Sequence, residues 1–433
     1  MRSTLELPKI ELPRVAKTLS CGATLLVSPR KGASVCAARI HVRGGPSLDP
    51  AKQAGLAYLV GALADQGTSR HSEEELAARL EPAGCEITGD ANGIGGTIAN
   101  AAWKLLLESL AEMLCSATYP EREFARQMKR LESRLVVERD DPRSQGGQRF
   151  KRLVYGDHWL GRPSYGTLET VARIPPQHVR RAHRAQWVGS RLIIGVCGDV
   201  EPKAVERVLE RALARLAPGR PFEPDTLVLP QPSARADAFP ADRAQVHVYL
   251  GHLGIRRSDP DYAPLVVMDH VLGTGPGFTN RISRRLRDEL GLAYSVHADI
   301  HASAGLLPGT FTAYIGTSPE KLSTAVEGFL REIRAIQARK VSERELSVAK
   351  NYLLGSFVLG FERSSRRANY LVSSELYGLP PDNLEQLPRA FAAVMPKDIQ
   401  RVARTHLFPD RCCLAAAGPT SRQDLLELLA RSA

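Results

Sequence analysis

Two residues in the second half of the chain, Arg287 and Tyr294, have side chains suited to peptide chemistry. They lie seven positions apart. A guanidinium group donates several hydrogen bonds in a fixed geometry that fits peptide carbonyl groups, and a phenol can stabilise the oxyanion of a tetrahedral intermediate. The simpler interpretation is a surface arginine at a helix end and a tyrosine half-buried in a strand. Spacing alone favours the simpler interpretation, so a functional role for the pair needs support from the rest of the chain.

The histidines and cysteines do not form a metal motif. His297 and His301 are four residues apart in an expected strand, where side chains at that spacing lie about 13 Å apart. His178 and His183 are five apart in a basic helix and lack a third ligand. The 7 cysteines are spread out with no Cys-x-x-Cys pair, which favours reduced thiols over a zinc–thiolate site. We therefore expect no metal and no cofactor in this chain.

A glycine-rich segment, 272–278, contains Gly273, Gly275 and Gly277. Glycine-rich turns can cradle phosphate, but a helical segment precedes this one where a strand is needed, and no Gly-Lys-Ser/Thr follows. The sequence therefore argues against nucleotide binding. Flexible entry into the next helix is the simpler interpretation of these glycines.

The elements that must position these residues occur twice along the chain. The segments 119–124 and 341–346 have almost the same letters, and each begins a long amphipathic helix. Ser342 and Glu345 form the expected capping box of the second helix. In each half a shorter helix precedes the long one, and a Tyr-Gly pair, a Pro-initiated helix and a short apolar strand follow it. This parallel order over about 200 residues predicts two homologous domains.

The fold expected for each domain is an α/β sandwich. Strands and helices mix without a strict βαβ rhythm, which favours an α+β fold with a mixed, largely antiparallel sheet packed with helices. The Pro- and Ala-rich composition of residues 218–243 is typical of a linker. We expect the first domain to span 1–217 and the second to span 244–433.

The net charge and the hydropathy of the chain limit the classes of partner that it is expected to bind. The net charge of +11 would attract acidic partners or nucleic acid. The basic residues are spread along the whole chain, however, so solvated helix faces explain the charge better than a nucleic-acid surface. No run of about 18 apolar residues predicts a membrane span, and residues 1–8 lack an apolar signal core. We expect a cytoplasmic protein with no nucleic-acid or membrane partner.

The segment 55–68 resembles the signature helix of the M16 zinc peptidases, the family of pitrilysin and mitochondrial processing peptidase. The family writes this helix with an inverted zinc motif, His-x-x-Glu-His, in which the histidines bind zinc and the glutamate is the general base. Here those positions hold Tyr58, Gly61 and Ala62, and the motif occurs nowhere in the chain. Glycine inside a helix is unfavourable by about 1 kcal/mol relative to alanine, so Gly61 indicates either close packing or a lost functional position.

The third zinc ligand of the family is also missing. The triplet 140–142, Asp-Asp-Pro, resembles the end of the helix that gives this ligand, a glutamate. Counting back from the proline places the ligand position at Arg134, and Glu138 would serve only if the alignment slipped by one turn. A cation at this position would repel zinc. The resemblance therefore implies a family member that has lost the whole ligand set.

The resemblance covers nearly the whole chain, from about residue 19 to residue 429, and it gives the second half a function. In the family, an arginine and a tyrosine spaced like Arg287 and Tyr294 reach from the C-terminal domain toward the zinc and hold the substrate backbone. The glycine-rich segment matches the place where non-catalytic subunits of mitochondrial processing peptidase carry a longer substrate-sensing loop. The resemblance thus implies substrate contacts for Gly273, Gly275 and Gly277.

Together these features imply a non-catalytic subunit of a heterodimeric M16 peptidase. The partner, a catalytic M16 subunit carrying His-x-x-Glu-His, would supply the zinc and the general base. This chain would complete the clamshell-shaped chamber and bind an unfolded peptide through Arg287 and Tyr294. The alternative is a structural or assembly M16-like core protein with no role in proteolysis. Retention of the Arg287/Tyr294 pair favours the first interpretation, because a scaffold needs neither residue. The sequence leaves the substrate open, between peptide maturation and general peptide degradation.

Overall fold

The first half of the molecule is built on a mixed sheet. The structure is a computed structural model that describes residues 10–224, 229–231, 233–275 and 279–432. The sheet has 6 strands in the order β1-β2-β6-β3-β5-β4. Strands β2 and β6 are parallel, and all other neighbours are antiparallel. The strands are β1 (Val15–Thr18), β2 (Thr24–Pro29), β3 (Val35–Val42), β4 (Glu86–Asp90), β5 (Gly93–Ala99) and β6 (Leu192–Gly198).

The second half repeats this sheet with one strand fewer. Its 5 strands lie in the order β7-β11-β8-β10-β9. Strands β7 and β11 are parallel, and the other neighbours are antiparallel. They are β7 (Arg235–Pro240), β8 (Val246–Leu253), β9 (Val296–Asp299), β10 (Thr310–Thr317) and β11 (Cys413–Gly418). Strand for strand, β7, β11, β8, β10 and β9 correspond to β2, β6, β3, β5 and β4. The predicted α+β fold with two mixed, largely antiparallel sheets is confirmed.

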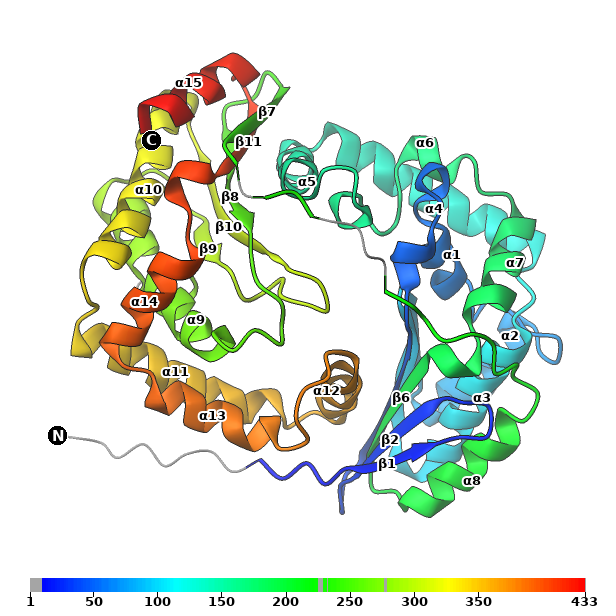
Figure 1. Cartoon of the computed structure of the whole chain (residues 1–433). Helices are drawn as coiled ribbons and strands as arrows, with labels where there is room; N and C mark the ends of the chain where they lie inside the picture. Colours follow the sequence, from blue (N-terminus) through cyan, green and yellow to red (C-terminus); the bar gives the residue numbers. More distant parts are fainter. Residues whose placement is uncertain (1–9, 225–228, 232, 276–278, 433) are drawn as a thin grey trace.

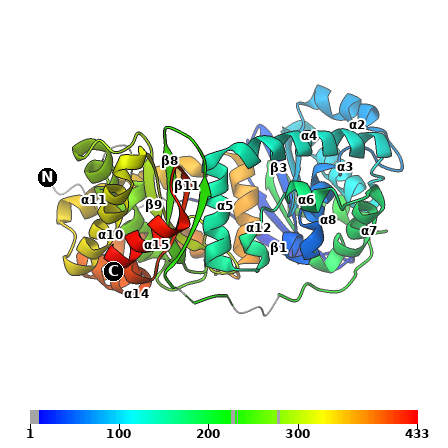
Figure 2. The ribbon, with the colours of Figure 1, turned by 90° about the horizontal axis from the view of Figure 1, so that it is seen from above.

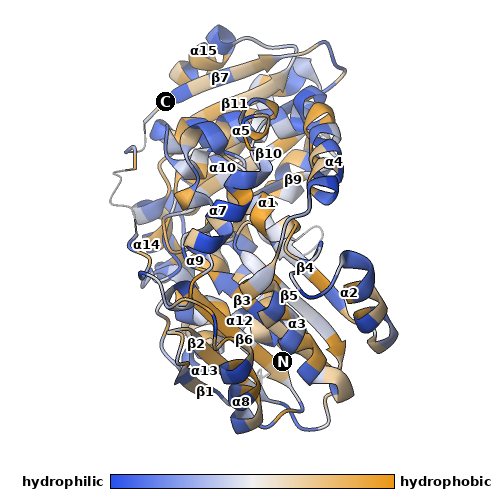
Figure 3. Ribbon diagram, turned by 90° about the vertical axis from the view of Figure 1, so that its right-hand side faces the viewer, coloured by the Kyte–Doolittle hydropathy of each residue, from blue (hydrophilic) through white to orange (hydrophobic). Residues whose placement is uncertain are grey.

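Helices cover one face of each sheet and enclose a separate core in each half. The capping box of Ser342 and Glu345 is present at the start of α11, and Pro176 and Pro396 begin α7 and α14 as expected. Figure 3 shows mostly hydrophilic residues along α4 and α7 and hydrophobic residues in the strands beneath. The helices of the first half are α1 (Leu56–Ala62), α2 (Glu73–Leu80), α3 (Trp103–Ser116), α4 (Glu121–Asp140), α6 (Leu168–Val171), α7 (Pro176–Gln186) and α8 (Pro202–Ala212). Those of the second are α9 (Tyr262–Asp269), α10 (Leu322–Ala338), α11 (Glu343–Gly360), α13 (Asn383–Ala393), α14 (Pro396–His406) and α15 (Arg422–Ser432).

Each half also places one helix on the other half's sheet. Helix α5 (Pro142–Tyr155) packs Phe150 and Val154 against Cys413 and Ala415 of the second sheet. Helix α12 (Ser364–Leu376) packs in the same way against β3 and β6 of the first sheet. Figures 1 and 2 show both helices between the two halves. Burying a large apolar side chain contributes roughly 1.5–3 kcal/mol, so this exchange couples the stabilities of the two halves.

The linker is shorter than the sequence indicated. Residues 235–240, inside the predicted linker 218–243, form β7 and pair in parallel with β11. Composition hid this strand because proline and polar residues flank it, while its partner lies far away in sequence. No helix of the described residues has the length and hydropathy needed to cross a membrane.

Candidate functional site

The helix that resembles the zinc helix is short and tightly anchored. Helix α1 begins after Gly55, whose φ of 102° suits glycine. The carboxylate of Asp49 accepts hydrogen bonds from the backbone N–H groups of Gly55 (3.0 Å) and Ala57 (2.9 Å). Tyr58 and Ala62 are half-buried and lie one above the other, as expected at a spacing of four in a helix. Tyr58 and Ala62 therefore share one face of α1, as the resemblance requires of the two positions.

Gly61 fits only because it has no side chain. A Cβ atom at this position would lie 1.9 Å from the carbonyl oxygen of Asp90 in β4, and one at Gly89 would lie 1.9 Å from the oxygen of Gly61. Helix and edge strand thus touch backbone to backbone. Of the two explanations offered by the sequence, the structure supports close packing. A glutamate here would require β4 to move.

A polar network fills the space around the predicted third-ligand position. Nε of Arg134 donates to Oε1 of Glu138 at 2.8 Å, and the Tyr165 hydroxyl donates to Oε2 of the same carboxylate at 2.6 Å. The Arg134 guanidinium lies 4.2 Å from the Tyr165 ring centre, and the Tyr58 ring packs edge-on against that ring at 6.3 Å. Burial and then Glu138 raise the pKa of Tyr165 to about 12, so its hydroxyl stays protonated at neutral pH.

These residues do not fit a zinc ion. Zinc takes imidazole, thiolate or carboxylate ligands, but Tyr58 and Ala62 offer none of these. Both oxygens of Glu138 accept hydrogen bonds, one of them from the cation Arg134. If Glu138 replaced Arg134 as a ligand, a zinc ion would have to compete with the hydrogen bonds from Arg134 and Tyr165 and with the charge of Arg134.

Arg287 and Tyr294 occupy different environments. Arg287 lies in the π-helical segment η8 (Ser283–Glu289), where its Nε donates to Oδ1 of Asp288 at 2.9 Å. Tyr294 precedes β9, and 96% of it is exposed. The expectation that Tyr294 is half-buried in a strand is wrong, because the strand begins at Val296. An aromatic ring that buries so little area contributes little to folding, which leaves it free for contact with another molecule.

The glycine-rich segment packs more tightly than expected for a substrate loop. Gly273 is buried in the π-helical segment η7 (His270–Thr274), and a Cβ there would lie 2.4 Å from the oxygen of Ala298 in β9. A Cβ at Gly275 would lie 2.3 Å from the oxygen of His270. These contacts give both glycines a packing role. Gly277 lies outside the described residues.

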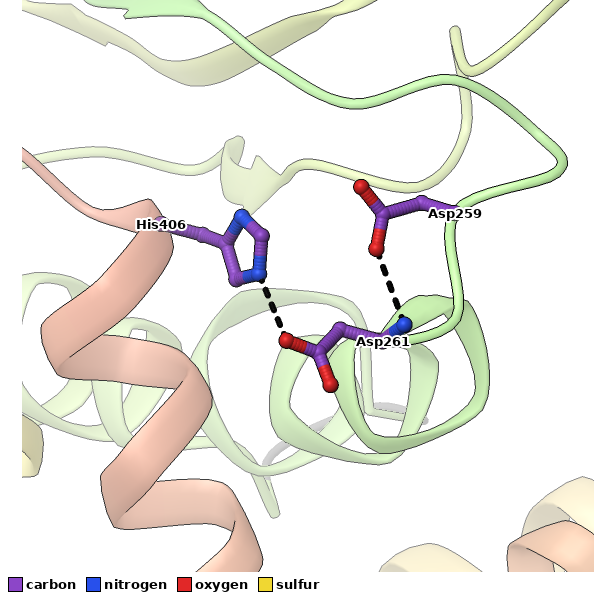
Figure 4. A group of neighbouring side chains, drawn as sticks. All are labelled: Asp259, Asp261 and His406. Atoms are coloured by element: carbon purple, nitrogen blue, oxygen red, sulfur yellow. Dashed lines mark hydrogen bonds and ion pairs between the residues drawn. The ribbon is translucent and has the colours of Figure 1, made fainter.

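Two groups of acidic residues and histidines in the second half were not singled out from the sequence. In the first group, shown in Figure 4, Asp261 accepts from Nε2 of His406 at 2.8 Å, and Asp259 accepts from the backbone N–H of Asp261 at 2.8 Å. Arg401 also donates two hydrogen bonds to Asp261 and lowers its pKa. The guanidinium already balances this carboxylate, so the group ties α9 to α14 and is not a metal site.

The second group lies where α9 meets the end of β9. Oδ2 of the fully buried Asp269 accepts from the backbone N–H of Ile300 and from Nδ1 of His301, at 2.8 and 2.6 Å. Although burial opposes it, the bond to Asp269 raises the pKa of His301. Burial and then Asp269 raise the pKa of Asp299 to about 6. A buried aspartate in an apolar helix was the sequence signal for this network, which holds β9 against α9.

Comparisons with known proteins agree with this geometry. A family model described as the Peptidase M16 inactive domain matches residues 173–353. An uncharacterized zinc protease of Streptomyces coelicolor is 24% identical over 366 residues, which cover 82% of this chain and 78% of that relative. The non-peptidase homolog YmxG of Helicobacter pylori is 24% identical over 374 residues, 85% of each chain.

Solved structures share the fold across almost the whole chain. A peptidase M16 inactive domain from Pseudomonas fluorescens superposes with a TM-score of 0.87 at 21% identity, covering 94% of this chain and 99% of that one. A chain of complex III2 from Candida albicans superposes with a TM-score of 0.81 at 14% identity, covering 96% and 99%. These likenesses agree with the two mixed sheets packed by helices. The family model and the relatives together support an M16-family member of the inactive type.

Proposed function

We propose that this chain is the non-catalytic subunit of a heterodimeric M16 peptidase. The observation that carries the proposal is a contrast within the molecule. The place of the zinc helix is closed by Gly61 against β4 and by Arg134 on Glu138, whereas Tyr294 of the predicted substrate pair stands exposed. A chain that lacks the zinc ligands but keeps Arg287 and Tyr294 to hold a peptide fits the role of a non-catalytic subunit.

In this proposal the partner, an M16 chain with His-x-x-Glu-His, supplies the zinc and the general base. The present chain closes the chamber and offers Arg287 and Tyr294 to an unfolded peptide. Such peptides can add as a strand to an open sheet edge. Strands β4 and β9 each form one edge of their sheet, and in this proposal the peptide pairs with one of them. A cytoplasmic location and the absence of nucleic-acid and membrane partners remain part of the proposal.

The test measures cleavage by the assembled pair. Co-purification with mass spectrometry identifies the partner, and cleavage of unstructured fluorogenic peptides is then compared for each chain alone and for the mixture. We expect Tyr294→Ala and Arg287→Gln each to lower cleavage by at least roughly tenfold, as loss of one transition-state or substrate contact does, with assembly unchanged on size exclusion. Tyr352→Ala serves as a control, since Tyr352 is a 43% exposed tyrosine elsewhere in the same half.

Equal cleavage by the partner alone would contradict the proposal. The second candidate function is an assembly protein with no role in proteolysis, and the similarity in fold to a chain of complex III2 favours it. A stable complex in which both substitutions leave cleavage unchanged would support that candidate.

A further inference from the structure

We propose that a pocket beside α5 binds a carboxylate group of the peptide, so that this subunit selects acidic peptides. The inference rests on the proposed function, because it assumes that an extended peptide enters the space between the halves. It adds a substrate class that neither the missing zinc motif nor the Arg287/Tyr294 pair specifies.

The pocket has a volume of about 550 Å³ and takes residues from both halves. Arg143 and Lys151 come from α5, and Arg162 and Tyr165 come from the loop that follows it. Tyr249 comes from β8 of the second sheet. Tyr165 also belongs to the polar network of Arg134 and Glu138, so the pocket adjoins this network.

The charge that lines the pocket is positive. The lining contains three basic residues, Arg143, Lys151 and Arg162, and one acidic residue, Asp49. That carboxylate is already engaged by the N–H groups of Gly55 and Ala57. Arg162 donates to the backbone oxygen of Asp157 at 2.7 Å. Across the residues that the structure describes, none of the three cations has a carboxylate oxygen within 4 Å. A group of cations without a carboxylate partner attracts an incoming anion, and the concave lining of the pocket adds to this attraction.

A row of three aromatic side chains, the aromatic floor, lies on the second sheet beside the pocket. His297 of β9, Tyr314 of β10 and Tyr249 of β8 are directly opposite one another in the sheet register. Their ring centres are 5.2 and 5.0 Å apart. Helix α5 lies over the Tyr249 end of the row, where a Cβ at Gly146 would come 2.9 Å from the ring.

Arg143 joins the floor to the pocket. Its guanidinium lies 4.8 Å from the Tyr314 ring centre and also lines the pocket. Burial lowers the pKa of His297, with Arg143 adding to the effect, so the floor is uncharged at neutral pH. A peptide that crosses this floor meets aromatic faces first and cations at the end. Tyrosine and arginine are the side chains most often found at strong binding contacts.

The corresponding row in the first half lacks these features. By register, Thr88, Gly95 and Arg39 take the places of His297, Tyr314 and Tyr249. Arg39 is held by two hydrogen bonds to Asp90, at 2.9 and 2.8 Å. Its charge is therefore balanced, and the row has no aromatic ring. The carboxylate pocket is a property of the second sheet with its borrowed helix α5.

The test compares four labelled peptides of twelve residues, built from Gly and Ser with either two central Glu or two central Gln, and ending in either a free carboxylate or an amide. Fluorescence anisotropy measures their binding to the full chain and to its complex with the partner. We expect the Glu peptides to bind about tenfold more tightly than the Gln peptides, equivalent to about 1.4 kcal/mol. Raising the salt concentration should reduce this ratio. A preference that follows the free C-terminus instead of Glu would assign the pocket to the terminal carboxylate.

The second part of the test removes the basic side chains of the pocket. The double variant Arg143→Gln/Lys151→Gln should bring the Glu-to-Gln ratio close to one. The control Arg331→Gln/Lys340→Gln removes two cations from a separate basic groove between α10 and α11 and should leave the ratio unchanged. Tight binding of all four peptides without preference would overturn the carboxylate pocket and leave the role as a non-catalytic subunit intact. Binding of none of them, with cleavage independent of this chain, would overturn that role itself.

Discussion

The two halves press a glycine of a helical segment against the backbone of their edge strand in the same way. Gly61 meets Asp90 of β4, and Gly273 meets Ala298 of β9. The flanking residues follow one burial pattern, half-buried at Tyr58 and His270 and buried at the next three positions. The neighbours differ. Tyr58 packs on Tyr165, whereas His270 lies 6.0 Å from His301.

This comparison teaches that the first half differs from the zinc motif that the sequence resembles by more than three side chains. The first half carries the same helix-on-strand contact as the second, and this contact leaves no volume for a side chain at Gly61, the position predicted for the general base. The residues around it have formed a satisfied network instead of leaving a gap. The site is therefore packed as a structural element. The following predictions test how much this packing contributes to the stability of the chain and whether it excludes zinc.

The largest effect is expected from filling the contact. Gly61→Ala places a Cβ 1.9 Å from a backbone oxygen, and Gly273→Ala places one 2.4 Å away. Overpacking typically costs about 1–3 kcal/mol and occasionally more, so we expect Gly61→Ala to destabilise the chain by about 3 kcal/mol and Gly273→Ala by about 2 kcal/mol. Urea unfolding of the full chain measures both.

The matched control is Gly355→Ala, a glycine inside α11 with nothing within 4 Å of the added Cβ. It should stabilise the chain by up to about 1 kcal/mol, since alanine is the better helix former. A cost for Gly61→Ala no larger than that for Gly273→Ala would show that β4 yields easily, and the two halves would then differ in rigidity.

The long helices α4 and α11 allow a second comparison, based on pH. Helix α11 starts with the Ser342 capping box, whose Glu345 is also held by Arg281 at 2.7 and 3.1 Å, whereas Pro120 precedes α4 without a side-chain cap. Although burial opposes it, Arg281 lowers the pKa of Glu345 from 4.5 to about 2. A lowered carboxyl pKa contributes stability above pH 4.5 that is lost as the pH falls toward 2.

Arg281→Gln should therefore cost about 1 kcal/mol at pH 6, after allowance for solvent screening, and only about a quarter of that at pH 2.5. Denaturant unfolding across this range measures the difference. As a control, Arg139→Gln removes an exposed pair with Asp140 at the end of α4 and should show little effect at either pH. A constant cost for Arg281→Gln at all pH values would exclude titration of Glu345 as the cause.

A smaller effect is expected inside the polar network of the first half. Tyr165→Phe removes the hydrogen bond to Glu138 and keeps the ring between Tyr58 and Arg134. The net value of such a bond is about 1 kcal/mol, because Arg134 still neutralises the carboxylate. A loss above about 3 kcal/mol in urea unfolding would mean that the network holds the halves together.

The sequence predicted those features that depend on local patterns. The repeated helix starts, the Ser342 capping box and the short apolar strands β6 and β11 follow from residue type and spacing. The exchange of α5 and α12 could not be predicted, because their apolar faces have no sequence mark that names the partner sheet. The close approach at Gly61 and the bonds of Tyr165 depend on segments far apart in the chain, and β7 depends on β11 in the same way.

The smallest effect is expected from restoring the family motif. The variant Tyr58→His/Gly61→Glu/Ala62→His/Arg134→Glu contains the complete set of zinc-binding and general-base side chains. We expect it to bind no stoichiometric zinc and to cleave no peptide, because the backbone of β4 occupies the space that a glutamate side chain in place of Gly61 would need. Metal analysis by mass spectrometry on the folded variant measures this, with the unmodified chain, also expected to hold no stoichiometric zinc, as the reference. One equivalent of zinc in the variant would show that the closed contact opens at little cost, and the first half would then be a zinc site lacking only its ligands.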